Sequence, residues 1–486
     1  MTATRVEKID RTNFYINDLK YTANSGDLWV SGFDPAFFKG AANVISEFEY
    51  EGRTMKVTRI VGEAFKNCTV LTSVTIPECI TKIEKNAFAG CANLETITIN
   101  SNVVMTESRE MFDFMVSTFG KQIKKYIIGN AVTRIPDYAF NKCEQLKSVD
   151  ISEGVTSIGR CAFQGCHDLL NIIIPNTVKY IGENAFDNTA WYENQADGLI
   201  YAGKVAYKYK GIMPAETRMI IKEDTTQIGN GAFKDCNGLK EIIIPNSIKI
   251  IDDFAFAGCC NMSRIQIPDN VDSIGDGVFF GCERLEEIAL PSKVKHMSVS
   301  FNGCKNLKSI SLPQGLCEID DFAFNDCVCL ENLIVPNLVK RIGNCAFYGC
   351  SKLRSIALPD TLASIGISAF SGCCELEDIN LPMSVTEIGG EAFKNCSKLR
   401  VITLPECLTN FAWCVFDGCY NLKIILCKAK TPPYVAEIDY GVEYGTFDLD
   451  SSIKYLATLV VPEESLGSYK TANYWQEFID IEGVPL

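Results

Sequence analysis

The feature that most constrains this chain is a short sequence pattern that returns along most of its length. The segment from Val155 to Pro175 reads V-T-S-I-G-R-C-A-F-Q-G-C-H-D-L-L-N-I-I-I-P, and that from Val385 to Pro405 reads V-T-E-I-G-G-E-A-F-K-N-C-S-K-L-R-V-I-T-L-P. Successive copies are mostly 23 residues apart. Self-similarity at such a period is the signature of stacked structural units. Each unit adds its own layer of core, so the 486 residues need not divide into globular domains.

The Phe of the pattern marks both the copies and their irregularities. Phe88 and Phe140 are 52 residues apart, and Phe186 and Phe233 are 47 apart, so each gap is close to two periods. We therefore expect one degenerate repeat inside each gap. The recurring Phe residues are Phe65, Phe88, Phe140, Phe163, Phe186, Phe233, Phe256, Phe279, Phe301, Phe324, Phe347, Phe370, Phe393 and Phe416.

Each copy predicts one strand and one turn. The shared pattern is V-x-x-I-G-x-x-A-F-x-x-C-x-x-L-x-x-I-x-I-P, whose end alternates as a strand does. Pro then ends the strand, because it cannot donate a ladder hydrogen bond. The A-F-x-x-C-x-x-L stretch predicts a short turn or 3₁₀ segment on the opposite wall. The Gly after Ile, as in Gly159, Gly343 and Gly366, predicts a left-handed turn residue.

Composition and charge exclude several classes of partner. Lys plus Arg is 46 against 60 for Asp plus Glu, which gives a net charge of −14. Nucleic acids and anionic membranes both attract clustered positive charge, so neither is an expected partner. No apolar run is long enough to span a membrane. The start, Met1-Thr-Ala-Thr4, lacks the apolar stretch of a signal peptide, which predicts either a cytosolic protein or one whose leader has been removed.

The cysteines follow the repeat and not a metal-binding or disulfide pattern. Of the 23 cysteines, those at one repeat position would form a column beside the Phe column. Free Cys behaves as a small buried hydrophobe, so we predict a reduced ladder. The members of that column are Cys68, Cys91, Cys143, Cys166, Cys236, Cys259, Cys282, Cys304, Cys327, Cys350, Cys373, Cys396 and Cys419.

No motif in the chain predicts catalysis or cofactor binding. The only histidines are His167 and His296, and neither stands in a recognisable nucleophile motif. The pairs Asp252-Asp253 and Asp320-Asp321 recur at one repeat position, which favours a turn role over acid/base chemistry. The sequence therefore predicts a non-catalytic protein without cofactor or metal.

The A-F-x-x-C-x-x-L core, as in Ala162 to Leu169, resembles the BspA-type leucine-rich repeat family, over about residues 50 to 426. The resemblance implies an α/β repeat solenoid: a right-handed leucine-rich-repeat solenoid of turns of about 23 residues, with one parallel β-sheet face and a cap at both ends. We expect an N-terminal cap over residues 1–50, the array over 51–430 and a C-terminal cap over 431–486. Interruptions are expected near 100–126, as a short helix, and within 190–220, where residues 198 to 211 predict a hairpin.

Outward positions of the strands predict where a ligand would bind. Most are small and polar, but Ile173, Ile243, Ile334 and Val401 are apolar. Exposed apolar residues can mark a contact site, although isolated ones need no explanation. Because Ile173 and Ile243 flank the aromatic interruption, we predict a contact patch there. The alternative is that the aromatic residues of the interruption only pack on the repeat wall. Its candidate ligand-contact residues are Ile173, Trp191, Tyr192, Tyr201, Tyr207, Tyr209, Ile243 and Arg264.

Three functional hypotheses follow. The family resemblance implies an adhesion module, on the cell surface or secreted, that binds a protein or glycan ligand on a host or microbial surface. The alternatives are a structural spacer or assembly element, and a carbohydrate-active β-solenoid enzyme, against which the lack of a non-repeating carboxylate cluster argues. A cytoplasmic location stays the alternative to the surface.

Overall fold

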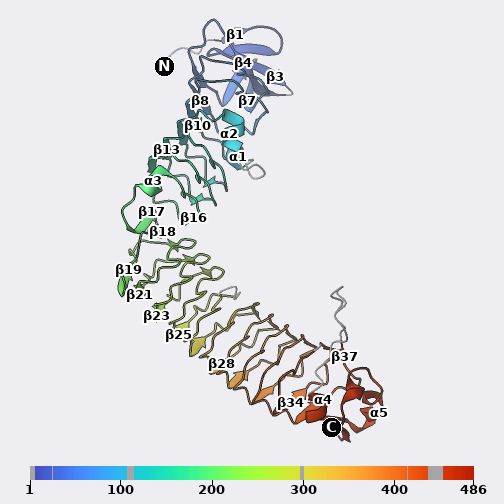
Figure 1. Ribbon diagram of the computed structural model, residues 1–486. Coiled ribbons are helices and arrows are strands. Elements are labelled where there is room, and N and C mark those ends of the chain that lie inside the picture. Colours follow the sequence, from blue (N-terminus) through green and yellow to red (C-terminus); the bar gives the residue numbers. More distant parts are fainter. Residues whose placement is uncertain are drawn as a thin grey trace. The chain divides into compact units, whose positions relative to one another are not determined.

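The structure, a computed structural model, describes residues 6–24, 26–106, 114–295, 300–412, 414–435 and 453–485. The chain divides into two units, Met1–Lys210 and Gly211–Leu486, each of which is a stack of short strands and turns (Figure 1). The division falls inside the interruption expected at 190–220. We refer to the two parts as unit 1 and unit 2.

Unit 1 begins with a mainly antiparallel sheet, most of which precedes the first repeat. Its strands lie in the order β1-β2-β3-β4-β7-β6, and the β4–β7 pair is parallel. Phe33 and Phe38 of this region reach the first ring of the repeat, Phe65, with centroid separations of 6.1 and 6.4 Å. The capping role of residues 1–50 stays a prediction. The strands are β1 (Val6–Lys8), β2 (Asn13–Ile16), β3 (Leu19–Asn24), β4 (Asp27–Phe33), β6 (Glu47–Tyr50) and β7 (Arg53–Ile60).

The repeats of unit 1 form a parallel sheet of long strands and a second parallel sheet of two-residue strands. The long strands are β5 (Ala41–Asn43), β8 (Ser73–Ile76), β10 (Thr96–Ile99), β11 (Lys125–Ile128), β13 (Ser148–Ile151) and β15 (Asn171–Ile173). The short strands at the V-x-x-I segments are β12 (Arg134–Ile135), β14 (Ser157–Ile158) and β16 (Tyr180–Ile181); β9 (Lys82–Ile83) pairs with β7. The sequence analysis predicted only one sheet, because a two-residue strand is too short to show an alternation.

Both interruptions have the predicted kind of structure. Residues 100–126 contain α1 (Asn102–Thr106) and α2 (Phe114–Phe119), although Met111 and Phe112 lie outside the described residues. Phe119 and Tyr126 continue the aromatic column between Phe88 and Phe140, so the expected degenerate repeat is confirmed. The second interruption contains α3 (Ala190–Glu193) and an antiparallel hairpin of β17 (Gly198–Ala202) and β18 (Val205–Lys210).

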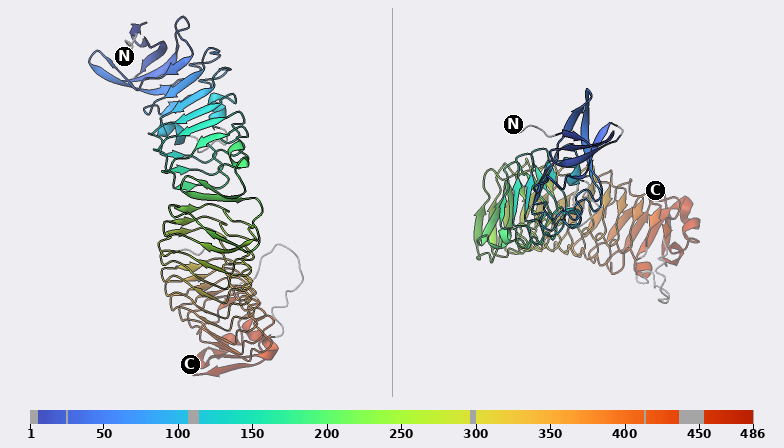
Figure 2. Two further views of the ribbon diagram at one scale, coloured as in Figure 1. Left: turned by 90° about the vertical axis from the view of Figure 1, so that its left-hand side faces the viewer. Right: turned by 90° about the horizontal axis from the view of Figure 1, so that it is seen from above.

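Unit 2 repeats the same two-sheet plan (Figure 2). Its first strand is the second degenerate repeat, because β19 has no Phe of its own and still pairs in parallel with β21. The long strands are β19 (Thr217–Ile220), β21 (Leu239–Ile243), β23 (Arg264–Gln266), β25 (Glu287–Ala289), β26 (Ser309–Ser311), β28 (Asn332–Ile334), β30 (Ser355–Ala357), β32 (Asp378–Asn380), β34 (Val401–Leu404), β36 (Ile424–Cys427), β38 (Thr458–Pro462) and β39 (Ile481–Val484). The short strands are β20 (Gln227–Ile228), β22 (Ile250–Ile251), β24 (Ser273–Ile274), β27 (Glu318–Ile319), β29 (Arg341–Ile342), β31 (Ser364–Ile365), β33 (Glu387–Ile388), β35 (Asn410–Phe411) and β37 (Tyr434–Val435).

The last described part of unit 2 ends the aromatic column with Trp475. Its ring lies 5.2 Å from that of Phe411, and its indole N–H donates to the carbonyl of Pro433 at 2.9 Å. Short helices α4 (Ile453–Leu456) and α5 (Leu466–Tyr469) flank this region. Whether residues 431–486 act as a cap stays a prediction.

Stacked rings run through the core of each unit. Phe347 lies 5.2 Å from both Phe324 and Phe370, with ring planes within 8° and 5° of parallel. The backbone follows the same step, since the Phe347 N–H donates to the carbonyl of Ala369 at 2.7 Å. Each turn is therefore held to the next by a backbone hydrogen bond and by ring contacts at once.

The wall opposite the long strands is made of turns, so the solenoid is built from β-structure and not from alternating strands and helices. Two residues of most copies have positive φ: the one before Ala, such as Asn184 (φ 54°), and the one before Cys, such as Asn395 (φ 59°). Left-handed residues interrupt a right-handed helix, which is why no helix forms here.

The Gly that follows Ile is not a left-handed residue, and that prediction was wrong. Gly159, Gly343 and Gly366 are absent from the positive-φ positions of the described chain. A Cβ on Gly343 would lie 2.5 Å from the backbone nitrogen of Asp321 on the preceding turn, closer than atoms can approach. Gly343 is therefore required by its contact with the preceding turn. Pro136 and Glu84 stand at the same position in other copies, so the requirement for Gly belongs to individual pairs of turns.

The column cysteines are free and reduced, as predicted, and they make a hydrogen bond that the sequence did not predict. The thiol of Cys350 donates to the carbonyl of Phe324 at 3.1 Å, and that of Cys373 donates to Phe347 at 3.3 Å. The same bond joins Cys91 to Phe65 at 2.9 Å. Burial raises the pKa of the Cys91 thiol to about 11, which keeps it protonated and able to donate at neutral pH.

We predict that the rate at which each cysteine is alkylated depends on whether it lies in the buried column. With iodoacetamide on the folded protein near pH 8, the exposed Cys317 and Cys407 should be modified rapidly, while Cys350 and Cys373 should react only after unfolding. Peptide mass spectrometry before and after denaturation measures this. Fast modification of Cys350 in the folded protein would contradict the ladder.

We also predict that alanine at the Gly after Ile destabilises the fold. Gly343→Ala should lower the free energy of unfolding by about 1–3 kcal/mol, because its Cβ meets backbone that cannot move aside. Gly467→Ala is the matched control, since nothing lies within 4 Å of its added Cβ. The control should change stability by less than about 1 kcal/mol. Denaturant unfolding measures both, and equal effects would refute the explanation.

Candidate binding surface

The long strands present one face to solvent, and the predicted outward positions are exposed. Ile173 of unit 1 has 82% of its surface exposed, and Ile243 of unit 2 has 54%. Strand alternation gives the reason: the neighbouring residues Ile172 and Ile242 point into the core and are buried. Ile334 and Val401 are also exposed, as predicted.

The aromatic residues of the second interruption pack around the end of a Phe column. Trp191 lies 4.8 Å from Phe186 by ring centroids, and Tyr207 lies 5.6 Å from the same ring. Thr189 caps α3, because its hydroxyl accepts the N–H of Tyr192 at 3.1 Å. Burial raises the pKa of the Tyr192 phenol to about 12.

Tyr207 is the most deeply placed of these side chains, with only 4% of its surface exposed. Its hydroxyl accepts the N–H of Phe186 and donates to a carboxylate oxygen of Asp187, both at 3.1 Å. Lys208 pairs with the other oxygen of Asp187 at 3.0 Å. These contacts give Tyr207 a structural role, which agrees with the alternative that the aromatic residues of the interruption pack on the repeat wall.

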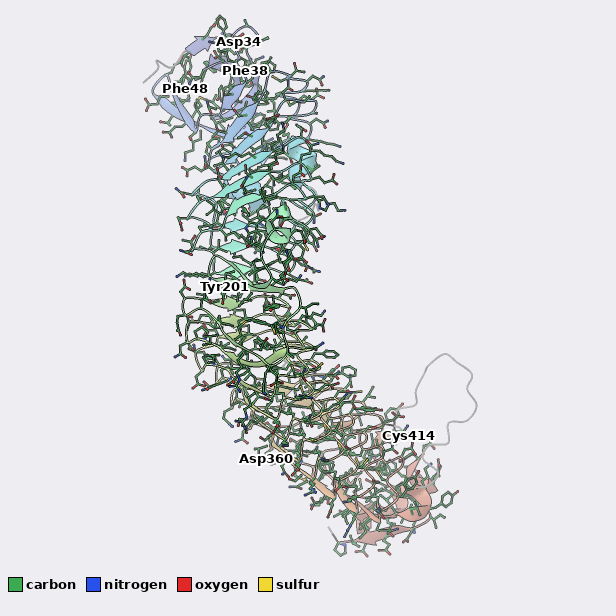
Figure 3. The ribbon with its side chains drawn as sticks, turned by 60° about the vertical axis from the view of Figure 1, so that its left-hand side comes forward. Asp34, Phe38, Phe48, Tyr201, Asp360 and Cys414 are labelled. Carbon is green, nitrogen blue, oxygen red and sulfur yellow. The ribbon has the colours of Figure 1, made fainter. Side chains whose placement is uncertain are left out.

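The remaining candidates are divided between the two units. Tyr201 and Tyr209 of the hairpin are half-buried, and Figure 3 places Tyr201 at the hairpin. Ile173 and the aromatic residues belong to unit 1, whereas Ile243 and Arg264 belong to unit 2. A ligand contact for the unit 1 residues stays a prediction.

In unit 2, Ile243 has an apolar neighbour that sequence reasoning missed. Ile220 of β19 lies beside Ile243 in the sheet register, and 68% of its surface is exposed. The strand that carries it belongs to a degenerate repeat without a recurring Phe, so the repeat pattern did not place it. The two isoleucines form an exposed apolar pair on neighbouring strands.

On the same face, the outward positions next to these isoleucines carry charged side chains of alternating sign. Arg218 pairs with Glu241 at 3.4 Å, and the register continues to Arg264 and Glu287. A shallow hollow of about 450 Å³ lies over these strands. Its lining includes Glu241, Ile243, Arg264, Gln266, Pro268 and Glu287. We call Ile220, Ile243 and this hollow the β19–β25 surface.

The carboxylate pairs of the turns have the predicted turn role. A carboxylate oxygen of Asp253 accepts the N–H of Asp276 at 2.8 Å, and Asp321 accepts that of Asn344 at the same distance. His167 is exposed, and His296 lies outside the described residues. Among the described residues, no three potential ligands lie together to hold a metal ion, and no described helix has the length and apolar character to cross a membrane.

The repeat pattern matches a known family. A model of the BspA type leucine rich repeat region matches residues 43–118, 206–331 and 317–433, which together are more than half of the chain. The chain belongs to the BspA-type leucine-rich repeat family. None of the curated proteins matches the chain.

Solved structures of similar proteins come from several bacteria. A leucine-rich cell surface protein from Faecalibacterium prausnitzii is 22% identical over 86% of this chain and 95% of its own, with a TM-score of 0.34. A leucine-rich repeat protein from Bacteroides ovatus is 22% identical over 97% of this chain and 99% of its own, with a TM-score of 0.35. The pneumococcal vaccine antigen PcpA is 18% identical over 98% of this chain and 99% of its own, with a TM-score of 0.30.

Membership of the BspA-type family suggests a protein-interaction or adhesion module. The β19–β25 surface lies on repeats that the family model matches. The family model covers residues 206–331, so Ile220, Ile243 and Arg264 all lie on BspA-type repeats. Of the aromatic group, Tyr207 also lies within the matched residues, whereas Trp191 and Tyr192 lie outside them.

We predict that the Tyr207 hydroxyl stabilises unit 1. Tyr207→Phe should lower the free energy of unfolding by about 1–3 kcal/mol, because it leaves the buried N–H of Phe186 without its acceptor. Tyr420→Phe is the control, since Tyr420 is largely exposed. Thermal unfolding measures both variants. An unchanged Tyr207→Phe would show that its hydrogen bonds contribute nothing.

Proposed function

We propose that this chain is a non-catalytic protein-binding module that holds its ligand on the β19–β25 surface. The observation that carries the proposal is the pair formed by Ile220 and Ile243, two large aliphatic side chains that are exposed and adjacent in the sheet register. Neither folding nor the repeat requires them, because most other outward positions are small and polar. Burying such a pair under a partner removes apolar surface from water.

The charged side chains beside the isoleucine pair would fix the orientation of a bound partner. Arg264 lies between Glu241 and Glu287 in the strand register, so the column has charges of both signs and no large field of either sign. Such a rim selects a partner with complementary charges in the right order. It does not attract a polyanion, which agrees with the net charge of −14.

The proposed partner and location are supported by the family. BspA-type repeats and the bacterial surface proteins to which this chain is similar support a ligand on a host or microbial surface and a location on the cell surface or outside the cell. A spacer function would leave the isolated chain without any saturable ligand. A glycan ligand would bind over the polar hollow and depend little on Ile220.

We predict that charge on the apolar pair abolishes binding. Ile220→Asp with Ile243→Asp should weaken the binding of a protein ligand, found by a screen against immobilised matrix proteins and mucins, by at least about tenfold. The physical reason is that each aspartate would have to lose its water under the partner. Surface plasmon resonance measures the change.

Ile367→Asp is the matched control, because Ile367 is an exposed isoleucine of unit 2 that follows the short strand β31 and not a long strand. This variant should bind as the unaltered chain does. Equal loss in the control and the double variant, or no loss in either, would refute the β19–β25 surface. A folded chain that binds nothing in the screen would favour the spacer.

A further inference from the structure

In most copies, three backbone N–H groups join one turn to the next. Those of Tyr138, Phe140 and Lys142 donate to alternate carbonyls of the following turn at 2.8, 2.7 and 2.9 Å. The donors are alternate residues as well, so the two turns meet as neighbouring segments of main chain do in a parallel ladder. Each set of N–H groups therefore fits a second segment of main chain.

The turn that precedes the first interruption has the same three N–H groups but no acceptor for them. They belong to Asn86, Phe88 and Gly90, and no atom of the described residues accepts a hydrogen bond from them. The next repeat is degenerate and supplies α2 instead of a regular turn. The Phe119 ring of α2 lies 5.1 Å from that of Phe88, so the ring column continues here whereas the backbone contact does not.

The second interruption shows that a missing turn need not leave these donors unpaired. Phe186 stands at the equivalent position there, and its N–H donates to the hydroxyl of Tyr207 at 3.1 Å. Phe119 lies beside Phe88 as Tyr207 lies beside Phe186, but it has no hydroxyl to offer. Phe88 is only 2% exposed, and an unpaired N–H in such a place costs free energy. Folding alone therefore does not explain the unpaired donors of the Phe88 turn.

A hollow of about 160 Å³ lies at these donors. Asn86, Phe88 and Gly90 line it from the turn, and Ser117 and Thr118 line it from the end of α2. The carbonyls of Ser117 and Thr118 also have no hydrogen-bond donor among the described residues. The hollow thus combines unpaired donors with unpaired acceptors, and its described lining contains no charged side chain. We call it the Phe88 hollow, and it is lined by residues 86, 88–92, 116–120 and 122.

The unpaired groups distinguish between classes of ligand. A carboxylate or phosphate would accept from the N–H groups, but it has no donor for the carbonyls of α2. The C-terminal end of a helix also opposes a negative charge, and the described lining offers no Lys or Arg to balance it. An apolar side chain would leave both sets of groups unpaired. A peptide group carries one donor and one acceptor, so a segment of main chain can satisfy both sets.

We propose that the Phe88 hollow receives a short extended main-chain segment of a partner protein. The carbonyls of that segment accept the N–H groups of Phe88 and Gly90, and its own N–H groups donate to Ser117 and Thr118. A volume of about 160 Å³ favours Gly and Ala in the segment. The main chain supplies the affinity in this mode of binding, as it does when a peptide adds a strand to a sheet. The hollow lies in unit 1 and does not depend on the β19–β25 surface of unit 2.

Amide hydrogen exchange of the full chain, followed residue by residue by NMR, tests the donors first. The N–H of Phe88 should exchange at least about tenfold faster than that of Phe140, which is hydrogen-bonded in the next regular turn. Equal protection of the two N–H groups would show that Phe88 already has an acceptor, and it would overturn the proposal.

The probe for binding is the peptide acetyl-Gly-Ala-Gly-Ala-Gly-amide, titrated up to its solubility limit. It should slow the exchange of Phe88 and Gly90 at least about threefold and leave Phe140 unchanged. The same peptide with thioamides keeps its shape but has weaker acceptors, so it should protect less. Exchange that the peptide leaves unchanged would show that water alone meets these groups. Equal protection by acetate would show an oxyanion site, and either result overturns the proposal.

A matched pair of variants tests the location. Ala92→Phe fills the hollow from its exposed rim and should abolish the protection by the peptide. Glu144→Phe places the same ring at the equivalent position of the Phe140 turn, whose N–H groups are paired, and should not. Both variants should keep the melting temperature, because both positions are exposed. Protection that survives Ala92→Phe, or that is lost equally in both variants, overturns the assignment.

Discussion

Everything in this fold depends on each turn matching the next at the spacing of a backbone hydrogen bond. The Phe324 N–H donates to Ala346 at 2.8 Å, and one turn later Phe347 donates to Ala369 at 2.7 Å. Side chains that point inward must then stack on their equivalents, so a position that suits one turn suits its neighbours too. Rings stack on rings, thiols donate to the carbonyls of the preceding turn, and glycine stands where the backbones come closest. The residue type at each inward position is therefore determined by contact between neighbouring copies more than by the conformation of any one copy.

This dependence explains how much of the fold could be predicted. The columns of Phe and Cys were predictable, because periodicity alone shows which positions recur. The reason for Gly343 was not, because the clash lies between its Cβ and the nitrogen of Asp321 on another turn, and conformational preference was the only argument that one copy offered. The left-handed position before Cys had a signal that was missed, namely its Gly, Asn or Asp in almost every copy, as in Gly349 and Asn395.

The candidate site shows the same division. Strand alternation correctly predicted that Ile173 and Ile243 are exposed, because it needs only the order of residues along one strand. It could not reveal Ile220, whose strand lies in a repeat that has lost its Phe, and it could not show that Tyr207 turns inward toward Phe186. The conformation of an irregular segment depends on the surface on which it packs. A repeat pattern in the sequence gives no information about that surface.

Where copies are held so nearly alike, the differences between them carry the information about function. Inward positions cannot vary without disturbing the neighbouring turns, whereas an outward residue such as Ser273 or Arg341 meets mainly solvent and the side chain beside it. Residues 251–256 and 319–324 have the same sequence and the same backbone contact. Among the described residues, only the second copy meets a guanidinium, because the first has Ser273 where the second has Arg341, and Ile250 where the second has Glu318. The copies of a repeat protein can thus be compared with one another, because one copy shows which contacts another copy lacks.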